Sequence, residues 1–272
     1  MMVARSAGEV GEALAPARAA GQSVGLVATM GAFHDGHLAL LRAASERCDV
    51  VVVSLFVNPA QFGPADDLAR YPRDEVGDAR KAAEVGVDLL FAPEPDEIYP
   101  VGFDTWIDPG ELATILEGAA RPGHFRGVAT VCAKLAGIVQ PQVAFFGRKD
   151  AQQVAVVKQV VRDLNLPVEI VAVPTVRDPD GLALSSRNAF LSAEERVVAL
   201  TLPRALEAGL QAHRSGTDGV AATQALLDAE PRLSVDYVAV ADLDGPTLAA
   251  AVRVGSTRLI DNVRLSEEAS GA

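Results

Sequence analysis

The sequence predicts an α/β fold, a doubly wound parallel sheet followed by a smaller C-terminal α+β domain. Short runs rich in valine, leucine and phenylalanine alternate with longer runs of helical periodicity in the N-terminal part of the chain. Near-continuous apolar runs are typical of parallel strands whose two faces are both covered by helices. Polar clusters follow several of these runs, and ligands bind at the carboxyl ends of the strands in such sheets.

Residues 1–175 are expected to form a Rossmann-like domain. Each predicted strand is a short apolar run bounded by polar or turn-forming residues. The predicted strands span residues 23–29, 50–57, 88–92, 143–146 and 168–173. The predicted helices between them show apolar residues at helical spacing and span residues 36–48, 74–86 and 150–164. This alternation is the pattern of a parallel sheet with helices on both faces.

Residues 176–272 show a different pattern, because strands and helices no longer alternate. The predicted elements are a long helix at 193–212, a helix near 220–227 and strands at 235–240 and near 258–262. A glycine-containing break separates the two helices. We therefore expect a second, smaller α+β domain here.

Composition and charge exclude several classes of protein. The 272 residues carry a net charge of −12, which disfavours a general nucleic-acid or anionic-membrane surface, since both require clustered lysine and arginine. The sequence shows no signal-peptide core and no apolar stretch long enough to span a bilayer. Cys48 and Cys132 are isolated, as in proteins of a reducing compartment. We expect a cytoplasmic protein without nucleic-acid or membrane partners, in which a local positive pocket could still bind ATP.

Two histidines at the start of a predicted helix are the most informative feature. His34 and His37 follow the first strand across a short turn that contains Gly31. Free backbone N–H groups and the helix dipole at such a position favour a phosphate. Zinc requires three or four ligands, and the cysteines lie far from any CxxC pattern. The motif alone is equally compatible with two ordinary polar residues at a helix start.

Three further polar clusters lie at predicted strand ends. They are residues 58–63, 147–150 and 180–188. Lys149 could neutralise phosphate charge, or it could simply pair with Asp150 at the surface. The Walker P-loop and the dinucleotide GxGxxG patterns are both missing, so a nucleotide would bind in another way. The Ser185-Ser186-Arg187 segment is compatible with a loop that closes over a triphosphate or with an ordinary turn.

Two glutamines and two further histidines complete the candidates. Gln61 and Gln153 could bind a small polar substrate, because an amide suits a carboxylate or hydroxyl without adding charge. Lone glutamines usually face solvent, so this interpretation depends on context. His124 is compatible with lining the site or with a basic loop, and His213 with a structural or exposed role.

Six motifs, in this order and spacing, resemble the pantoate–β-alanine ligase family of the HxGH nucleotidyltransferase group. They are HDGH (34–37), FVNPAQF (56–62), YPRD (71–74), LEGAARPGHFRGV (116–128), FFGRKDAQQ (145–153) and TVRDPDGLALSSRN (175–188). The resemblance covers most of residues 24–192 and extends more weakly to VDYVAVADL (235–243) and RLIDN (258–262).

The resemblance implies a two-step reaction. ATP, accompanied by Mg²⁺, adenylates the carboxylate of (R)-pantoate and releases pyrophosphate, and the amine of β-alanine then displaces AMP to give pantothenate. It also implies a homodimer with no tightly bound organic cofactor. Because an acyl adenylate hydrolyses readily, residues 176–272 are expected to cap the active site of the first domain.

The resemblance also implies roles for individual residues. The catalytic residues would be His37, as the proton donor, with His34 and Lys149. The pantoate site would include Gln61, Gln153 and Asn58, and Gln61 would border β-alanine as well. The ATP site would be formed by Met30, Gly31, Ala32, Phe33, His34, Asp35, Gly36, His37, Gly147, Arg148, Lys149, Asp150, Val176, Leu184, Ser185, Ser186 and Arg187.

The chain departs from the family pattern at four places. Ala28 stands where members usually have proline, Ala151 where many have an aromatic residue, and Leu184 where many have methionine. On the helix after YPRD, Gly77 replaces an acidic position and leaves only Asp78, so we assign no protein ligand to the metal.

Two other functions are open on this sequence. A different HxGH adenylyltransferase would keep His34 and His37 but would not need Gln61 and Gln153 in their motifs. A non-catalytic nucleotide sensor could lose His37 or Lys149 and keep the fold. Pyrophosphate release that depends on pantoate separates the ligase from both.

Overall fold

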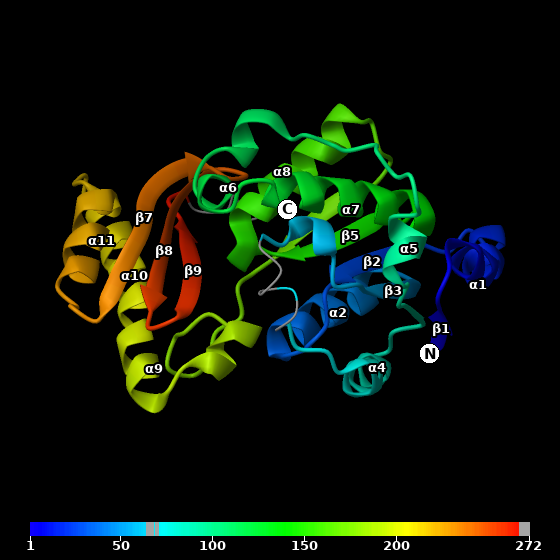
Figure 1. The fold of residues 1–272 in the computed structure, drawn as a ribbon, viewed down its shortest axis with the longest axis horizontal. Helices are drawn as coiled ribbons and strands as arrows, with labels where there is room; N and C mark the ends of the chain where they lie inside the picture. Colours follow the sequence, from blue (N-terminus) through cyan, green and yellow to red (C-terminus); the bar gives the residue numbers. More distant parts are fainter. Residues whose placement is uncertain (64–67, 69–70, 267–272) are drawn as a thin grey trace. The chain divides into compact units, whose positions relative to one another are not determined.

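The computed structural model describes residues 1–63, 68 and 71–266 of the chain (Figure 1). The chain divides into two compact units. The first comprises Met1–Arg148 and Gln152–Val173, and the second comprises Lys149–Ala151 and Pro174–Ala272. In the described part of the chain, no helix combines the length and apolarity needed to cross a membrane.

The first unit is built on a six-stranded parallel sheet, which confirms the predicted α/β fold. The strand order is β1-β4-β3-β2-β5-β6. The strands are β1 (Met2–Ala4), β2 (Val24–Thr29), β3 (Val50–Leu55), β4 (Leu89–Phe91), β5 (Val143–Gly147) and β6 (Glu169–Val173). The order reverses at β2, so the turn that follows this strand lies at a switch point where doubly wound sheets bind ligands.

Helices cover both faces of this sheet, as its apolar strands require. One apolar core packs α1, α7 and α8 against the sheet, and the other packs α2 and α4 against the opposite face. The helices are α1 (Ala7–Ala19), α2 (Asp35–Arg47), α4 (Glu75–Glu84), α5 (Pro95–Ile98), α6 (Glu117–Ala120), α7 (His124–Val139) and α8 (Ala151–Asp163). Single 3₁₀ turns lie at Pro59–Gln61, Gly110–Ala113 and Arg148–Asp150. The sequence analysis did not predict β1, α1 or α7.

The second unit packs helices against a three-stranded antiparallel sheet of order β7-β8-β9. Its elements are the 3₁₀ helix Ser186–Phe190, α9 (Ala193–Ala199), α10 (Thr201–Arg214), α11 (Gly219–Asp228), β7 (Leu233–Asp242), β8 (Pro246–Val254) and β9 (Thr257–Arg264). This unit has the predicted α+β character. Strand β8, the central one, was not predicted, because its alanine-rich sequence has low strand propensity.

The prediction of one helix over residues 193–212 is wrong. The chain forms α9 and α10, which meet at Leu200. Pro203 explains the break, because a proline inside a continuous helix would clash with the carbonyl of Ala199, four residues earlier. Restarting the helix at Thr201 places Pro203 in the first turn of α10, where its missing N–H costs nothing.

Candidate functional site

The β2–α2 turn carries the two predicted phosphate-binding histidines. His34 is the N-cap residue of α2, and its Nδ1 accepts a hydrogen bond from Gly36 N at 3.1 Å. His37 Nδ1 accepts from His34 N at 3.3 Å, and the two ring centroids lie 4.2 Å apart. Since each Nδ1 is an acceptor, each neutral imidazole carries its proton on Nε2. Both rings can therefore present an Nε2–H group as a hydrogen-bond donor at the positive end of α2.

The backbone before the histidines has an unusual conformation. Gly31 has a φ of +92° and Ala32 a φ of +55°. A Cβ on Gly31 would lie 2.7 Å from Leu55 Cδ1 and 3.0 Å from Asp78 Oδ2, so the turn accepts only glycine there. Left-handed backbone at Ala32 is unfavourable for a residue with a side chain, and contacts from elsewhere must hold it.

Helix α4 supplies those contacts. Asp78 is 1% exposed, and its Oδ2 and Oδ1 accept hydrogen bonds from Ala32 N and Phe33 N, both at 2.7 Å. One turn further along α4, Lys81 Nζ donates to Phe33 O at 2.6 Å. The sequence analysis considered Asp78 only as a remnant of a metal-facing cluster. Its carboxylate instead holds the main chain of the turn.

Gln61 lies close to the same turn. It is buried, and its Nε2 lies 3.0 Å from Met30 Sδ. Its Oε1 accepts from Asn58 Nδ2 at 2.9 Å, and its main-chain oxygen accepts from His124 Nδ1 at 2.7 Å. The first unit therefore brings Met30, Asn58 and Gln61 together. It also places His124 among these residues, at the buried first position of α7, and not in a basic loop.

Asn58 is fully engaged by the protein. Its Nδ2 donates to Gln61 Oε1 and to Gly127 O at 3.1 Å, and its Oδ1 accepts from Tyr99 Oη at 2.8 Å. The Oδ1 atom also accepts from Ala60 N at 3.2 Å. An amide with two donated and two accepted bonds has little left for a ligand. In this geometry Asn58 orients Gln61, and Tyr99 is a partner that the sequence analysis missed.

The two glutamines at the start of α8 differ in role. Gln152 is buried, accepts from Glu117 N at 3.0 Å and donates to Leu112 O and Ile115 O. It thereby fixes the segment that precedes α7. Gln153, the predicted substrate ligand, is only partly buried in the same helical turn.

The second unit contains Lys149, Asp150, Val176 and residues 184–187 of the predicted ATP site. Lys149, Ser185 and Arg187 line one small pocket of this unit. Lys149 Nζ lies 3.7 Å from Asp150 Oδ1, so the predicted ion pair exists, although only 17% of the lysine side chain is exposed. Ser185 caps the 3₁₀ helix Ser186–Phe190 by accepting from Arg187 N. Val176 O accepts a hydrogen bond from Leu184 N, which brings these two predicted ATP-site residues side by side.

The described residues contain no cluster of three or more histidine, cysteine, aspartate or glutamate side chains that could hold a metal ion. Asp78, the acidic residue left on the helix after YPRD, uses both carboxylate oxygens for main-chain N–H groups.

Comparisons with known proteins agree with these features. The family model described as pantoate-beta-alanine ligase matches residues 2–264. The chain is 49% identical to the pantothenate synthetase of Pelotomaculum thermopropionicum, covering 98% of this chain and all of that protein. It is 52% identical to pantothenate synthetase 1 of Bradyrhizobium diazoefficiens, covering 98% and 99% of the two chains.

Solved structures give the same result. The pantothenate synthetase of Thermus thermophilus superposes with a TM-score of 0.90 at 45% identity, covering 98% of this chain and all of that one. The pantoate-beta-alanine ligase of Francisella tularensis, in complex with beta-gamma ATP and beta-alanine, has a TM-score of 0.86 at 35% identity, covering 97% and 98%. The chain belongs to the pantoate–β-alanine ligase family.

Proposed function

We propose that this protein condenses pantoate with β-alanine in an ATP-dependent reaction that forms pantothenate, AMP and pyrophosphate. The observation that carries the proposal is the capped histidine pair at the start of α2, beside the buried Gln61, at the carboxyl edge of the parallel sheet. Family membership and the ligands named for the Francisella structure support the choice of substrates.

The first step joins the pantoate carboxylate to the α-phosphorus of ATP and breaks the bond to pyrophosphate. Negative charge grows on the phosphate oxygens as this happens, and preorganised donors stabilise such charge. His34 and His37 supply Nε2–H donors, with His37 as the proton donor that the resemblance implies. Lys149 supplies a positive charge for the phosphates. Mg²⁺ enters bound to ATP as part of the substrate.

The second step joins the amine of β-alanine to the acyl carbon and releases AMP. Gln61 and Gln153 are proposed to hold the hydroxyls and carboxyl group of pantoate, and Gln61 to border β-alanine. The neutral amide of Gln61, fixed by Asn58, can contact a polar ligand without a charge that would oppose the incoming amine.

The test is the release of pyrophosphate and AMP from MgATP. We expect pyrophosphate release with pantoate alone, and sustained AMP and pantothenate formation only after β-alanine is added. His37→Ala and Lys149→Ala are each expected to lower kcat by about 10²-fold or more. ATP binding without any pantoate-dependent pyrophosphate would contradict the proposal and favour another HxGH substrate or a sensor.

Three further features remain proposals from the sequence and the resemblance. We expect a homodimer, which light scattering of the purified protein would test, and a cytoplasmic location, which fractionation of cells would test. The capping role of residues 176–272 predicts slower hydrogen exchange when ATP and pantoate are bound.

A further inference from the structure

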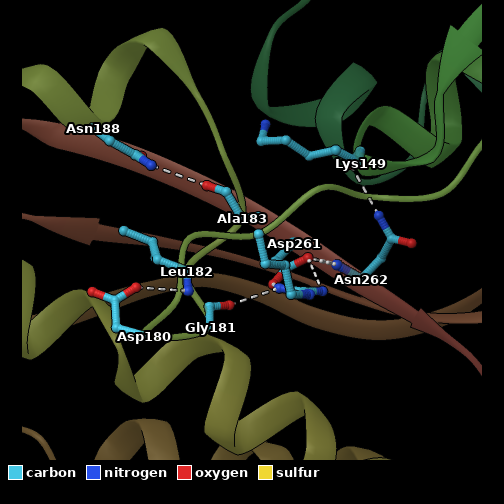
Figure 2. Close-up of polar contacts among 9 residues, drawn as sticks. Lys149, Asp180, Gly181, Leu182, Ala183, Asn188, Asp261 and Asn262 are labelled. Carbon is cyan, nitrogen blue, oxygen red and sulfur yellow. Dashed lines mark hydrogen bonds and ion pairs between the residues drawn. The ribbon is translucent and has the colours of Figure 1, made fainter. Parts of the chain in front are cut away.

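We propose that Asp261 and Asn262, adjacent on β9, are positioning residues for the phosphate-directed groups of the second unit. Asn262 would hold Lys149, and Asp261 would hold the segment that carries Ser185 and Arg187 (Figure 2). This inference rests on the proposed function, because it assigns Lys149 and this segment to ATP. Neither residue of the pair was assigned a role in the sequence analysis, which noted only the motif RLIDN.

The contact of Asn262 with Lys149 spans 113 residues of sequence. Asn262 is buried, and its Nδ2 donates to Lys149 O at 2.9 Å. Lys149 lies in the single 3₁₀ turn Arg148–Asp150, between β5 and α8. A hydrogen bond to this main chain fixes the point from which the lysine side chain extends into the pocket.

Asp261 also lines the pocket and contacts the loop through Arg177. Its side chain is 1% exposed and accepts two hydrogen bonds from the guanidinium, from Nη1 at 2.6 Å and Nη2 at 3.0 Å. It also accepts from Asn262 N at 2.8 Å. A bidentate arginine–carboxylate pair fixes direction as well as distance. The side chain of Arg177 therefore has one defined orientation against Asp261 of β9.

Arg177 also contacts the loop that precedes Leu184. It donates to Gly181 O at 3.2 Å and forms an isolated antiparallel bridge with Ala183. Ala183 O in turn accepts from Asn188 Nδ2 at 3.0 Å, as Figure 2 shows. The residues that flank the segment 184–187, Ala183 and Asn188, are thus hydrogen-bonded to each other. Ala183 also pairs with Arg177, whose guanidinium binds Asp261.

The two anchoring contacts, Asn262 with Lys149 and Asp261 with Arg177, come from neighbouring positions on β9. Successive side chains of a strand point in opposite directions. The strand is therefore a common reference for Lys149 and for the segment 184–187. Of this segment, Ser185 and Arg187 line the same pocket as Lys149, although they lie far from it in sequence. If these residues only stabilised the fold, the buried Arg177–Asp261 pair would be explained. The effect of an Asn262 substitution on activity would then not depend on the side chain of Lys149.

The decisive variant is Asn262→Asp, which keeps the shape of the side chain and removes its donor. We expect kcat/KM for ATP in pantoate-dependent pyrophosphate release to fall about 10- to 100-fold, since small misplacements of a catalytic group have effects of this size. The KM for pantoate should be unchanged. Asn262→Ser, which retains a hydroxyl donor, should be less impaired. Gln224→Glu makes the same chemical change at a half-buried position of α11, outside the pocket, and should behave like the unmodified protein.

A double-mutant cycle separates positioning from stability. In a Lys149→Ala background, Asn262→Asp should cause little further loss, because the side chain that it would displace is already gone. An equal loss in both backgrounds would overturn the proposal, as would normal kinetics of Asn262→Asp. Arg177→Lys tests the second anchor independently and should also raise the KM for ATP, because lysine cannot make the bidentate contact.

ATP affinity measured by calorimetry keeps the inference separate from the proposed function. If the unmodified protein released no pantoate-dependent pyrophosphate, the proposed function would fail. The binding comparison would still decide this inference. Weaker ATP binding by Asn262→Asp than by Gln224→Glu would support it, and equal binding would overturn it.

Discussion

Replacing Asp78 by asparagine should destabilise the β2–α2 turn and impair the reaction together. The carboxylate accepts two short, charge-assisted hydrogen bonds from Ala32 N and Phe33 N and is 1% exposed. Asparagine at this position keeps one acceptor oxygen, but its NH₂ group then faces the second main-chain N–H, and two donors cannot form a hydrogen bond. A hydrogen bond to a charged group contributes about 1.5–3 kcal/mol, and a buried unsatisfied donor costs about 1–3 kcal/mol. Since these terms overlap, we expect Asp78→Asn to lose about 2–4 kcal/mol of unfolding free energy.

Urea unfolding of Asp78→Asn, followed by circular dichroism, measures this loss. Asp88→Asn is the matched control, because this exposed carboxylate accepts one main-chain bond, from Val51 N at 2.8 Å, and should lose about 1 kcal/mol or less. We also expect kcat of the folded Asp78→Asn variant to fall at least about tenfold, since His34 and His37 follow the turn. Equal stability of the two variants, or a normal kcat for Asp78→Asn, would refute this reasoning.

Three other predictions concern the first unit. Tyr99→Phe removes the hydroxyl that donates to Asn58, so the variant should lose about 1 kcal/mol of unfolding free energy in thermal unfolding. It should also raise the KM for pantoate but not the KM for ATP. An unchanged KM for pantoate would contradict the role of Asn58 in orienting Gln61. In Gly127→Ala the new Cβ would meet the main chain at Gln61 N, at 2.6 Å, so pantoate titrations should show weaker binding; normal binding would exclude this close approach. Burial raises the pKa of Cys132 to about 12. At pH 8, iodoacetamide should therefore label this thiol far more slowly in the native protein than in urea, and labelling of the native protein should become faster as pH rises toward 12. Equally fast labelling of the native and unfolded proteins would show that the thiol is not enclosed.

The features predicted correctly from sequence are those encoded in short segments. The strand, turn and helix around His34 are contiguous, so hydrophobic periodicity and the glycine-containing turn suffice to predict them. The same applies to the strand that ends at Gly147. Helix α7 was not predicted because its first turn, around His124, is basic and follows Pro122 and Gly123, which are typical of a loop. Strand β8 was missed because its burial between β7 and β9, and not its alanine-rich sequence, makes it a strand.

The contacts that hold the site could not be predicted from sequence, because they join distant segments. Asp78 reaches Ala32 across 46 residues, and Asn262 reaches Lys149 across 113. Nothing in the spacing of these residues specifies that an aspartate will bind main-chain N–H groups and not a metal. The sequence therefore supplies candidates for residues that face a ligand, but it does not indicate which residues hold those candidates in place.

The same contacts explain how a chain with a net charge of −12 can offer a site to a polyanion. The buried carboxylates of each unit near the candidate residues are already matched, Asp78 by two main-chain N–H groups and Asp261 by a bidentate guanidinium. In the hairpin before Leu184, hydrogen bonds from Arg196 hold the pKa of Asp180 below its usual range, so this carboxylate stays charged and paired. A carboxylate compensated by its own donors adds little repulsion toward a phosphate. The net negative charge of the chain is thus compatible with a local excess of hydrogen-bond donors at the candidate site. Whether ATP can bind depends on how the individual carboxylates near the site are paired with their own donors, and not on the total charge.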